Sequence, residues 1–493
     1  MSEETTGENI ESAETQSTRV AAPTDYKPLS KPLKIFYGIG DFGFTLMSNV
    51  ETYYFMFFLT NFAMFDPAIA AVISTIGSTI DAIVGWTLGG FLNAIKPMKW
   101  GRYRSWLLFA PWIVPVLFAF EYTVLSENVV LSAALITVFY VLAHITWDFP
   151  YVSNVTMVAV AGKTPEDRAQ LASTRAMWAN ASKIIFSYIF PPVALLGAQL
   201  FGETSQYAFA ALVFGCVFAA CYNIHFVLLK GYEKEYTKEE LAKYKQTKKD
   251  DKDRNTFGDM MRALFQNSSL ICLLLSDISK WVFNFTVAGI AVYYFTYVVF
   301  QPAVLATYIF ISNVLCVVGA YVSSPMLKIT KSSKNNCIFA FVLMMAMLVI
   351  ARFDYTNMWL AIVFLSIAQF GYGIIYSSIA ALYGDCVVYS EWKTGKNSAG
   401  WISGLQLAPL KIGFIARGVI IPAILAAVGF TAGMEPSEST LALQEGIANG
   451  FMVMPAILLA ISALLLIFGF RLTPKKLKEY QAEIDKRKLE EGK

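Results

Sequence analysis

Charged side chains are scarce in this chain of 493 residues. Asp, Glu, Lys and Arg make up 15% of the sequence and hydrophobic residues 56%, whereas a typical soluble domain is about 25% charged. Apolar runs long enough to cross the roughly 30 Å hydrocarbon core of a bilayer recur along the chain. This composition excludes an ordinary soluble domain and predicts an all-α polytopic membrane protein.

Histidine is almost absent, and the cysteines show no pairing pattern. The two histidines, His144 and His225, are interpreted as packing or hydrogen-bonding residues, and the six cysteines include no Cys-x-x-Cys pair. The sequence also lacks the His-x-x-x-His, Asp-Asp-x-x-Asp and Gly-x-Ser-x-Gly arrangements of metal-dependent or nucleophilic enzymes. We therefore predict no metal, no cofactor and no enzymatic activity, which disfavours a membrane-embedded transferase.

Twelve of the apolar runs are predicted to span the membrane. They lie at about 36–62, 67–95, 105–125, 129–161, 171–200, 206–229, 268–299, 302–327, 337–353, 358–384, 399–429 and 446–470. The polar segment 231–266 separates six spans from six, which predicts two pseudo-symmetric six-helix bundles with a substrate site between them at mid-membrane. The predicted divisions are a disordered cytoplasmic tail (1–33), two bundles (34–230 and 267–471), the cytoplasmic linker (231–266) and a cytoplasmic tail (472–493).

Lys and Arg are concentrated on one side of these spans. The loops at 96–104, 163–168, 328–334 and 393–396 all carry them, whereas the loops after the first, third, fifth, seventh and eleventh spans carry none. By the positive-inside rule both termini are cytoplasmic, in the inner membrane of a bacterium. The net charge of +3 thus reflects topology and indicates no nucleic-acid partner.

Several ionisable residues fall inside the predicted spans. Asp81 lies midway along one of them, and a carboxylate at the bilayer centre costs about 2.5–3.5 kcal/mol. The others are Asp41, Glu51, Asp148, Arg175, Lys183, Asp277, Lys280, Lys411 and Arg417, with Glu121 nearer a span end. One interpretation is structural salt bridges, above all between Asp277 and Lys280. Because buried pairs stabilise poorly, the set as a whole favours a polar cavity, and the nearby aromatic residues suit a sugar.

Four stretches resemble the glycoside–pentoside–hexuronide:cation symporter family, the family of melibiose permease in the major facilitator superfamily. They are residues 37–43, 81–108, 148–151 and 389–413, which include the sequence Tyr-Ser-Glu-Trp-Lys-Thr-Gly-Lys at 389–396. They occur in both halves in the family's order. The resemblance implies a major facilitator fold of twelve helices and transport by alternating access.

The resemblance places Asp81 at the first acid of the family's cation site. Gly85 stands where a second acid is expected, so the site offers one carboxylate. Sodium requires several oxygen ligands, whereas a lone buried carboxylate can carry a proton. Of the two possible coupling ions, H⁺ and Na⁺, we therefore prefer H⁺. Alternatively, Lys411 holds Asp81 permanently and coupling is altered or lost.

The resemblance also implies a sugar site formed by Asp148, Arg175, Gln406 and Lys411. Thr45 stands where the family has a sugar-binding acid and is also predicted to bind the substrate. Loss of that acid, together with the additional charges Lys183 and Arg417, favours an anionic glycoside such as a uronide. Asp41, Glu51, Lys183 and Arg417 are the further candidate cavity charges. Arg102, Arg104, Glu391 and Lys396 are predicted to form a cytoplasmic gate through ion pairs between two loops.

These features together predict a secondary active transporter. It imports a sugar or glycoside by cation-coupled symport, is surrounded by membrane lipid, and is expected to be a monomer. The alternatives are an uncoupled facilitator or exchanger of glycosides and, from another class, a membrane sugar sensor that does not transport.

Overall fold

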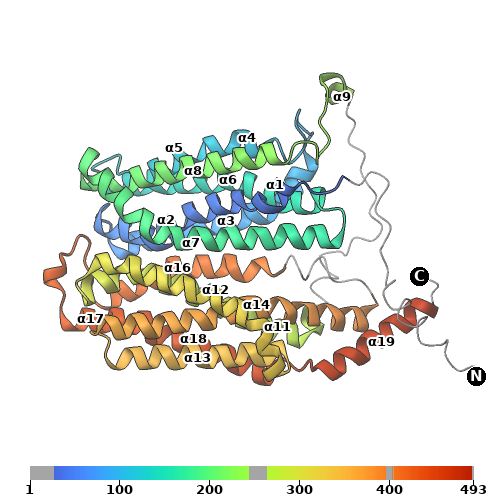
Figure 1. Ribbon diagram of the computed structural model, residues 1–493. Coiled ribbons are helices and arrows are strands. Elements are labelled where there is room, and N and C mark those ends of the chain that lie inside the picture. The colour runs from blue at the N-terminus through green and yellow to red at the C-terminus, as the bar shows by residue number, and fades with distance from the viewer. Residues whose placement is uncertain (1–26, 244–263, 396–401, 403–404, 491–493) are drawn as a thin grey trace, which may run out of the picture.

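The computed structural model describes residues 27–243, 264–395, 402 and 405–490, and these residues are almost entirely helical (Figure 1). The predicted all-α fold is confirmed. Most of the predicted N-terminal tail (1–33) and the middle of the predicted linker (231–266) lie outside the described residues.

Three long helices of the N-terminal half begin at a side-chain cap, formed by Asp66, Asn128 and Thr164. Asp66, for example, precedes the helix and accepts a hydrogen bond from the Ala68 amide. The first helical residue is Pro67, and proline is favourable at this position because the first helical amides have no partner within the helix. The elements are α1 (Lys31–Phe36), α2 (Ile39–Asn61), α3 (Pro67–Ala94), α4 (Trp106–Phe109), η1 (Ala110–Trp112), α5 (Val114–Glu121), α6 (Val129–Ala161), α7 (Pro165–Phe201), η2 (Glu203–Ser205), α8 (Gln206–Leu228) and α9 (Lys238–Lys243).

The C-terminal half contains short π-helical turns within its membrane helices. The elements are α11 (Ser268–Tyr293), η3 (Tyr294–Val298), η4 (Pro302–Val304), α12 (Leu305–Thr330), α13 (Ser333–Phe353), α14 (Met358–Thr394), α16 (Leu407–Ala427), η5 (Pro436–Glu438), α17 (Leu441–Ala448), η6 (Asn449–Val453), α18 (Met454–Leu464), η7 (Leu465–Gly469) and α19 (Pro474–Glu490). The helix α19 follows the last span and lies against α14.

In the described part of the chain, ten helical segments are long and apolar enough to cross a membrane. The charged helix α2 and the shorter segment Trp106–Glu121 account for the other two predicted spans. That shorter segment was predicted as one helix and is instead broken by the turn η1. Pro111 and Pro115 lie at the break, and proline removes a helical hydrogen bond and clashes with the preceding turn.

The helices α7 and α14 are longer than the apolar runs that predict them. Each has 37 residues, or about 55 Å at the α-helical rise. This exceeds the roughly 30 Å hydrocarbon core. Both therefore continue as helix beyond the apolar layer, and Glu391 lies on the extension of α14.

The two halves lie side by side and meet along α3 with α16, α2 with α11, and α7 with α12 (Figure 1). Gly418 permits the first of these contacts. A β-carbon at this position would lie 2.6 Å from the Oγ of Ser74 on α3. Any side chain at Gly418 would therefore push α16 away from α3.

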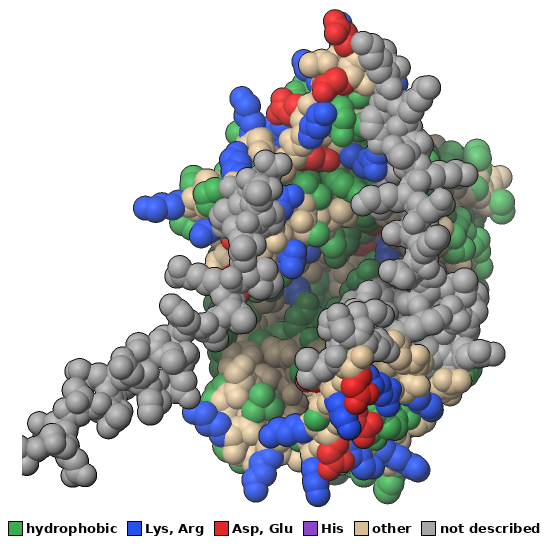
Figure 2. All heavy atoms as spheres, turned by 90° about the vertical axis from the view of Figure 1, so that its right-hand side faces the viewer, with side chains coloured by type: hydrophobic (Ala, Val, Ile, Leu, Met, Phe, Trp, Pro, Cys, Tyr) green, Lys and Arg blue, Asp and Glu red, His purple; other side chains and the backbone are tan. Residues whose placement is uncertain are grey.

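The halves are joined at one end of the molecule and separated at the other. We call the end that carries α1, α9 and α19 the termini face, and Figure 2 shows a hollow between the halves on this face. At the opposite face the Thr60 hydroxyl lies 2.7 Å from the Tyr293 hydroxyl, and the Gly433 amide donates to the Thr60 carbonyl at 2.9 Å. The conformation is therefore closed at the opposite face and open at the termini face.

Candidate substrate site between the two halves

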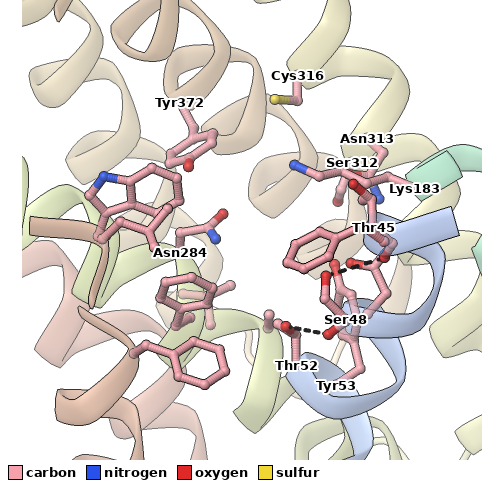
Figure 3. Close-up of a pocket in the computed structure, with 18 of the residues that line it drawn as sticks. Thr45, Ser48, Thr52, Tyr53, Lys183, Asn284, Ser312, Asn313, Cys316 and Tyr372 are labelled. Carbon is pink, nitrogen blue, oxygen red and sulfur yellow. Dashed lines mark hydrogen bonds between the residues drawn. The ribbon is translucent and has the colours of Figure 1, made fainter. Parts of the chain in front are cut away.

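A cavity of ≈ 230 Å³ lies between the two halves (Figure 3). The N-terminal half lines it with Thr45, Ser48, Tyr53, Asp81, Asp148 and Lys183, and the C-terminal half with Trp281, Asn284, Asn313, Gln369, Tyr372 and Lys411, among others. Hydroxyl, amide, carboxylate and ammonium groups thus face one space, and aromatic rings lie beside them. Such a lining can hydrogen-bond the hydroxyls of a sugar and stack on its CH faces.

A chain of buried charges forms one wall of this cavity. The Lys411 ammonium donates to Asp81 at 2.7 Å and lies 4.0 Å from Asp148. The Asp81–Lys411 pair joins α3 to α16, so it connects the two halves. Lys411, the partner of Asp81 in the alternative interpretation of the sequence, is in contact with it in this conformation.

Behind that wall the chain of charges continues away from the cavity. His144 lies between Asp81 and Glu51, and Arg417 donates to Glu51 at 3.0 Å. The Tyr140 hydroxyl donates to the same Glu51 carboxylate at 3.0 Å. Glu51 and Arg417 were predicted as cavity charges, but they do not line this cavity and instead form a second pair between the halves, α2 to α16.

Lys183 is half-buried and differs from the other intramembrane bases in its surroundings. It projects from α7 towards Ser312, Asn313 and Cys316 on α12 (Figure 3). In the part of the chain that the structure describes, no carboxylate lies within ion-pair distance of it. Lys183 therefore places a positive charge in the cavity among neutral hydrogen-bonding groups.

Residues 36–474 match the family described as MFS/sugar transport protein. The chain belongs to this family. It is accordingly a multi-pass membrane transporter of sugars and not an enzyme.

Relatives of this sugar transporter extend over almost its whole length. A candidate sulfoquinovose importer of Escherichia coli is 25% identical, with 95% of this chain and 97% of that protein covered. A glucuronide carrier protein homolog of the same organism is 23% identical, with 92% and 95% covered. The crystal structure of a D-xylose–proton symporter has the same fold, with a TM-score of 0.60, 10% identity, and 90% of this chain and 97% of that chain covered.

Two of the predicted sugar-binding residues of the transporter lie outside the cavity lining in this conformation. Arg175 on α7 forms a two-nitrogen contact with Asp41 on α2, the shortest distance being 2.7 Å, and Asn154 donates to the same carboxylate at 2.8 Å. Gln406 precedes α16, five residues before Lys411. Asp41 and Arg175 thus tie helices within the N-terminal half, while Thr45, Asp148 and Lys411 line the cavity as expected.

Two of the predicted gate residues, Arg102 and Arg104, make contacts within the N-terminal half. Glu233 accepts the backbone amides of Arg102 and Arg104, at 2.7 and 2.8 Å, and Arg104 pairs with Glu235 at 2.6 Å. Lys396 lies outside the described residues. The gate between the two loops remains a prediction for the conformation that is closed at the termini face.

Sequence reasoning did not assign a functional role to His144. It precedes Asp148 by four residues on α6, so both lie on one face of that helix. This spacing was the available signal, but a single histidine in an apolar helix is usually a packing residue.

The predicted pair of Asp277 and Lys280 does form, at 2.6 Å, away from the cavity.

Proposed function

We propose that this transporter imports a glycoside or sugar acid that carries an anionic group, by cation-coupled symport across the inner membrane. The observation that carries the proposal is Lys183. Its ammonium faces the cavity beside amide and hydroxyl groups, with no carboxylate of the described residues to neutralise it. An anion bound there would form a charge-assisted hydrogen bond, which is about twice as strong as a neutral one.

The two acids of the cavity both face Lys411. Asp81 and Asp148 lie 2.7 and 4.0 Å from its ammonium, and among the described residues neither is within ion-pair distance of Lys183. A neutral sugar would leave the Lys183 charge in the cavity without a counter-ion, at a desolvation cost. A carboxylate or sulfonate on the substrate removes that cost.

The remaining lining suits the neutral part of such a substrate. Asn284 and Tyr372 project from the C-terminal half towards Thr45 and Ser48 on α2 (Figure 3). Asp148 accepts hydrogen bonds from sugar hydroxyls. The names of two relatives, a candidate importer of sulfoquinovose and a glucuronide carrier homolog, support an anionic sugar, since these compounds carry a sulfonate and a carboxylate.

Transport follows from alternation between two arrangements of the halves. We assign the termini face to the cytoplasm from the Lys and Arg pattern of the loops, so the present conformation is open to the cytoplasm. The contacts of Thr60 with Tyr293 and Gly433 would break when the outward-facing conformation forms. The loop that carries Arg102 and Arg104 and the end of α14 that carries Glu391 would then close the cytoplasmic side.

Uptake by proteoliposomes tests the proposal. Phenyl glucuronide and phenyl glucoside share one aglycone and differ in the carboxylate, so they isolate the contribution of the charge. Each is supplied with an inward proton gradient, an inward sodium gradient, or neither. Concentrative uptake of the glucuronide in preference to the glucoside is expected. Preference for the glucoside would refute the anionic substrate, and equilibration without accumulation under every gradient would identify a facilitator.

A further inference from the structure

His144 is fully buried between two carboxylates. Its Nε2 lies 3.0 Å from Glu51 Oε2, and its Nδ1 lies 3.4 Å from Asp81 Oδ1. Neither contact has the geometry of a hydrogen bond, so the ring meets both acids as charge contacts. Two carboxylates at these distances attract a positively charged ring and give no such attraction to a neutral one. The position of the ring between two acids therefore fits its protonated form.

The charges that surround the ring also call for a bound proton. The titratable and charged groups on the helices around it are Glu51 on α2, Asp81 on α3, Glu121 on α5, Tyr140 and Asp148 on α6, and Lys411 and Arg417 on α16. Neither carboxyl oxygen of Glu121 has a hydrogen-bond partner among the described residues, which favours the uncharged acid. The other three carboxylates then face two cations, and a proton on His144 balances the cluster.

The two ion pairs between the halves lie at different depths along α16. Lys411 binds Asp81, and Arg417 binds Glu51 and also donates to the Thr52 carbonyl at 3.4 Å. The two bases are six residues apart on α16, which corresponds to about 9 Å. His144 joins the two pairs, because it contacts the acid of each.

We propose that His144 is the proton-binding site of this transporter and that the coupled ion is a proton. The inference deepens the proposed function and rests on it, since it assumes that transport is coupled to a cation. One proton adds to the free ring nitrogen to give imidazolium and later leaves to water, and no other bond forms or breaks. Asp81 is the route between the ring and the cavity, because it lines the cavity.

A glutamine at position 144 tests the role in coupling. It keeps hydrogen-bonding capacity but cannot be protonated, so His144→Gln should still exchange labelled for unlabelled substrate while losing proton-driven accumulation. Substrate-induced proton uptake, followed with a pH dye inside the vesicles, should also disappear. Accumulation at the wild-type level by this variant would overturn the proposal.

The second histidine provides the matched control. His225 is also fully buried, packs edge-on against Tyr37 at 4.7 Å, and makes no ion pair within the described residues. The variant His225→Gln should therefore keep proton-driven accumulation. An equal loss in both variants would indicate a general effect on folding and would count against a specific role for His144.

A spectroscopic measurement tests the site without transport. In His225→Gln, His144 is the one histidine left in the sequence, so ¹⁵N-histidine NMR of the labelled protein reports on that ring alone. An imidazolium signal that converts to the neutral form within about pH 5 to 8, or at a pH moved by added glucuronide, supports the proposal. A neutral ring throughout, or an imidazolium that never loses its proton, would overturn it.

The two readouts separate this proposal from the proposed function. If wild-type vesicles take up no anionic glycoside, the assigned substrate is wrong, and the NMR titration still decides whether His144 binds a proton reversibly. If wild-type uptake is driven by sodium and not by protons, the substrate assignment stands and the assignment of the coupled ion fails.

Discussion

Replacement of Lys183 by glutamine isolates the charge that we assign to substrate recognition. Glutamine keeps a flexible polar side chain and an N–H donor at this position on α7, but removes the positive charge. In the structure Lys183 has neutral neighbours on α12, namely Ser312, Asn313 and Cys316. The substitution should therefore leave no buried acid without its partner, and its effect on binding should come from the substrate.

The magnitude follows from the kind of contact that is lost. A hydrogen bond to a charged group contributes about 1.5–3 kcal/mol. Since each 1.4 kcal/mol is about tenfold, the Kd for phenyl glucuronide should rise roughly 10- to 150-fold. Phenyl glucoside has no such contact to lose, so its Kd should change little.

Calorimetric titration of the purified protein in detergent measures both constants. The control is Lys328→Gln, which removes a lysine charge from the exposed end of α12, away from the cavity lining. It should leave both constants unchanged. Equal weakening of the two ligands by Lys183→Gln would mean that Lys183 supports the fold of the cavity, and an unchanged glucuronide Kd would refute its contact with the anion.

Three further changes test how the halves are held together. Tyr293→Phe removes a hydroxyl contact at the opposite face worth about 0.5–1.5 kcal/mol. In a Cys316→Ser background, which removes the native cavity thiol, a cysteine introduced at Ser48 should therefore react faster with an impermeant thiol reagent added from outside. Arg417→Met leaves buried Glu51 with His144 as its remaining cationic partner and should lower stability by about 3 kcal/mol. Adding Glu51→Gln should recover much of this in thermal melts, and no recovery would contradict the pairing. Gly418→Leu should force α16 from α3 and increase the same labelling, whereas unchanged labelling would show that this contact does not hold the halves together.

The helices could be predicted from the sequence because each one obeys a local rule. An apolar run of sufficient length must form a helix in lipid, where backbone groups have no other partner. The exceptions are local as well. Pro111 and Pro115 break the third span, and the polar ends of α7 and α14 continue the helix beyond the apolar run.

The partners of the buried charges were harder to predict. The pair of Asp277 and Lys280 could be predicted because i, i+3 residues share a helix face. Asp41 and Arg175 are 134 residues apart, and several acids could have paired with that arginine on chemical grounds. Only the packing of α2 against α7 determines which of them does.

The two proposed sites share Lys411, and this sharing gives the coupling its sign. An oxygen of the substrate that draws Lys411 away from Asp81 leaves His144 as the principal cationic partner of that acid, and so strengthens proton binding at the ring. Conversely, a proton on His144 partly neutralises Asp81 and releases Lys411 for the substrate. Because such coupling is reciprocal, glucuronide affinity should increase as the pH falls and His144 takes up its proton. In His144→Gln that pH dependence should vanish while binding itself persists; an unchanged pH dependence would place the coupling proton elsewhere.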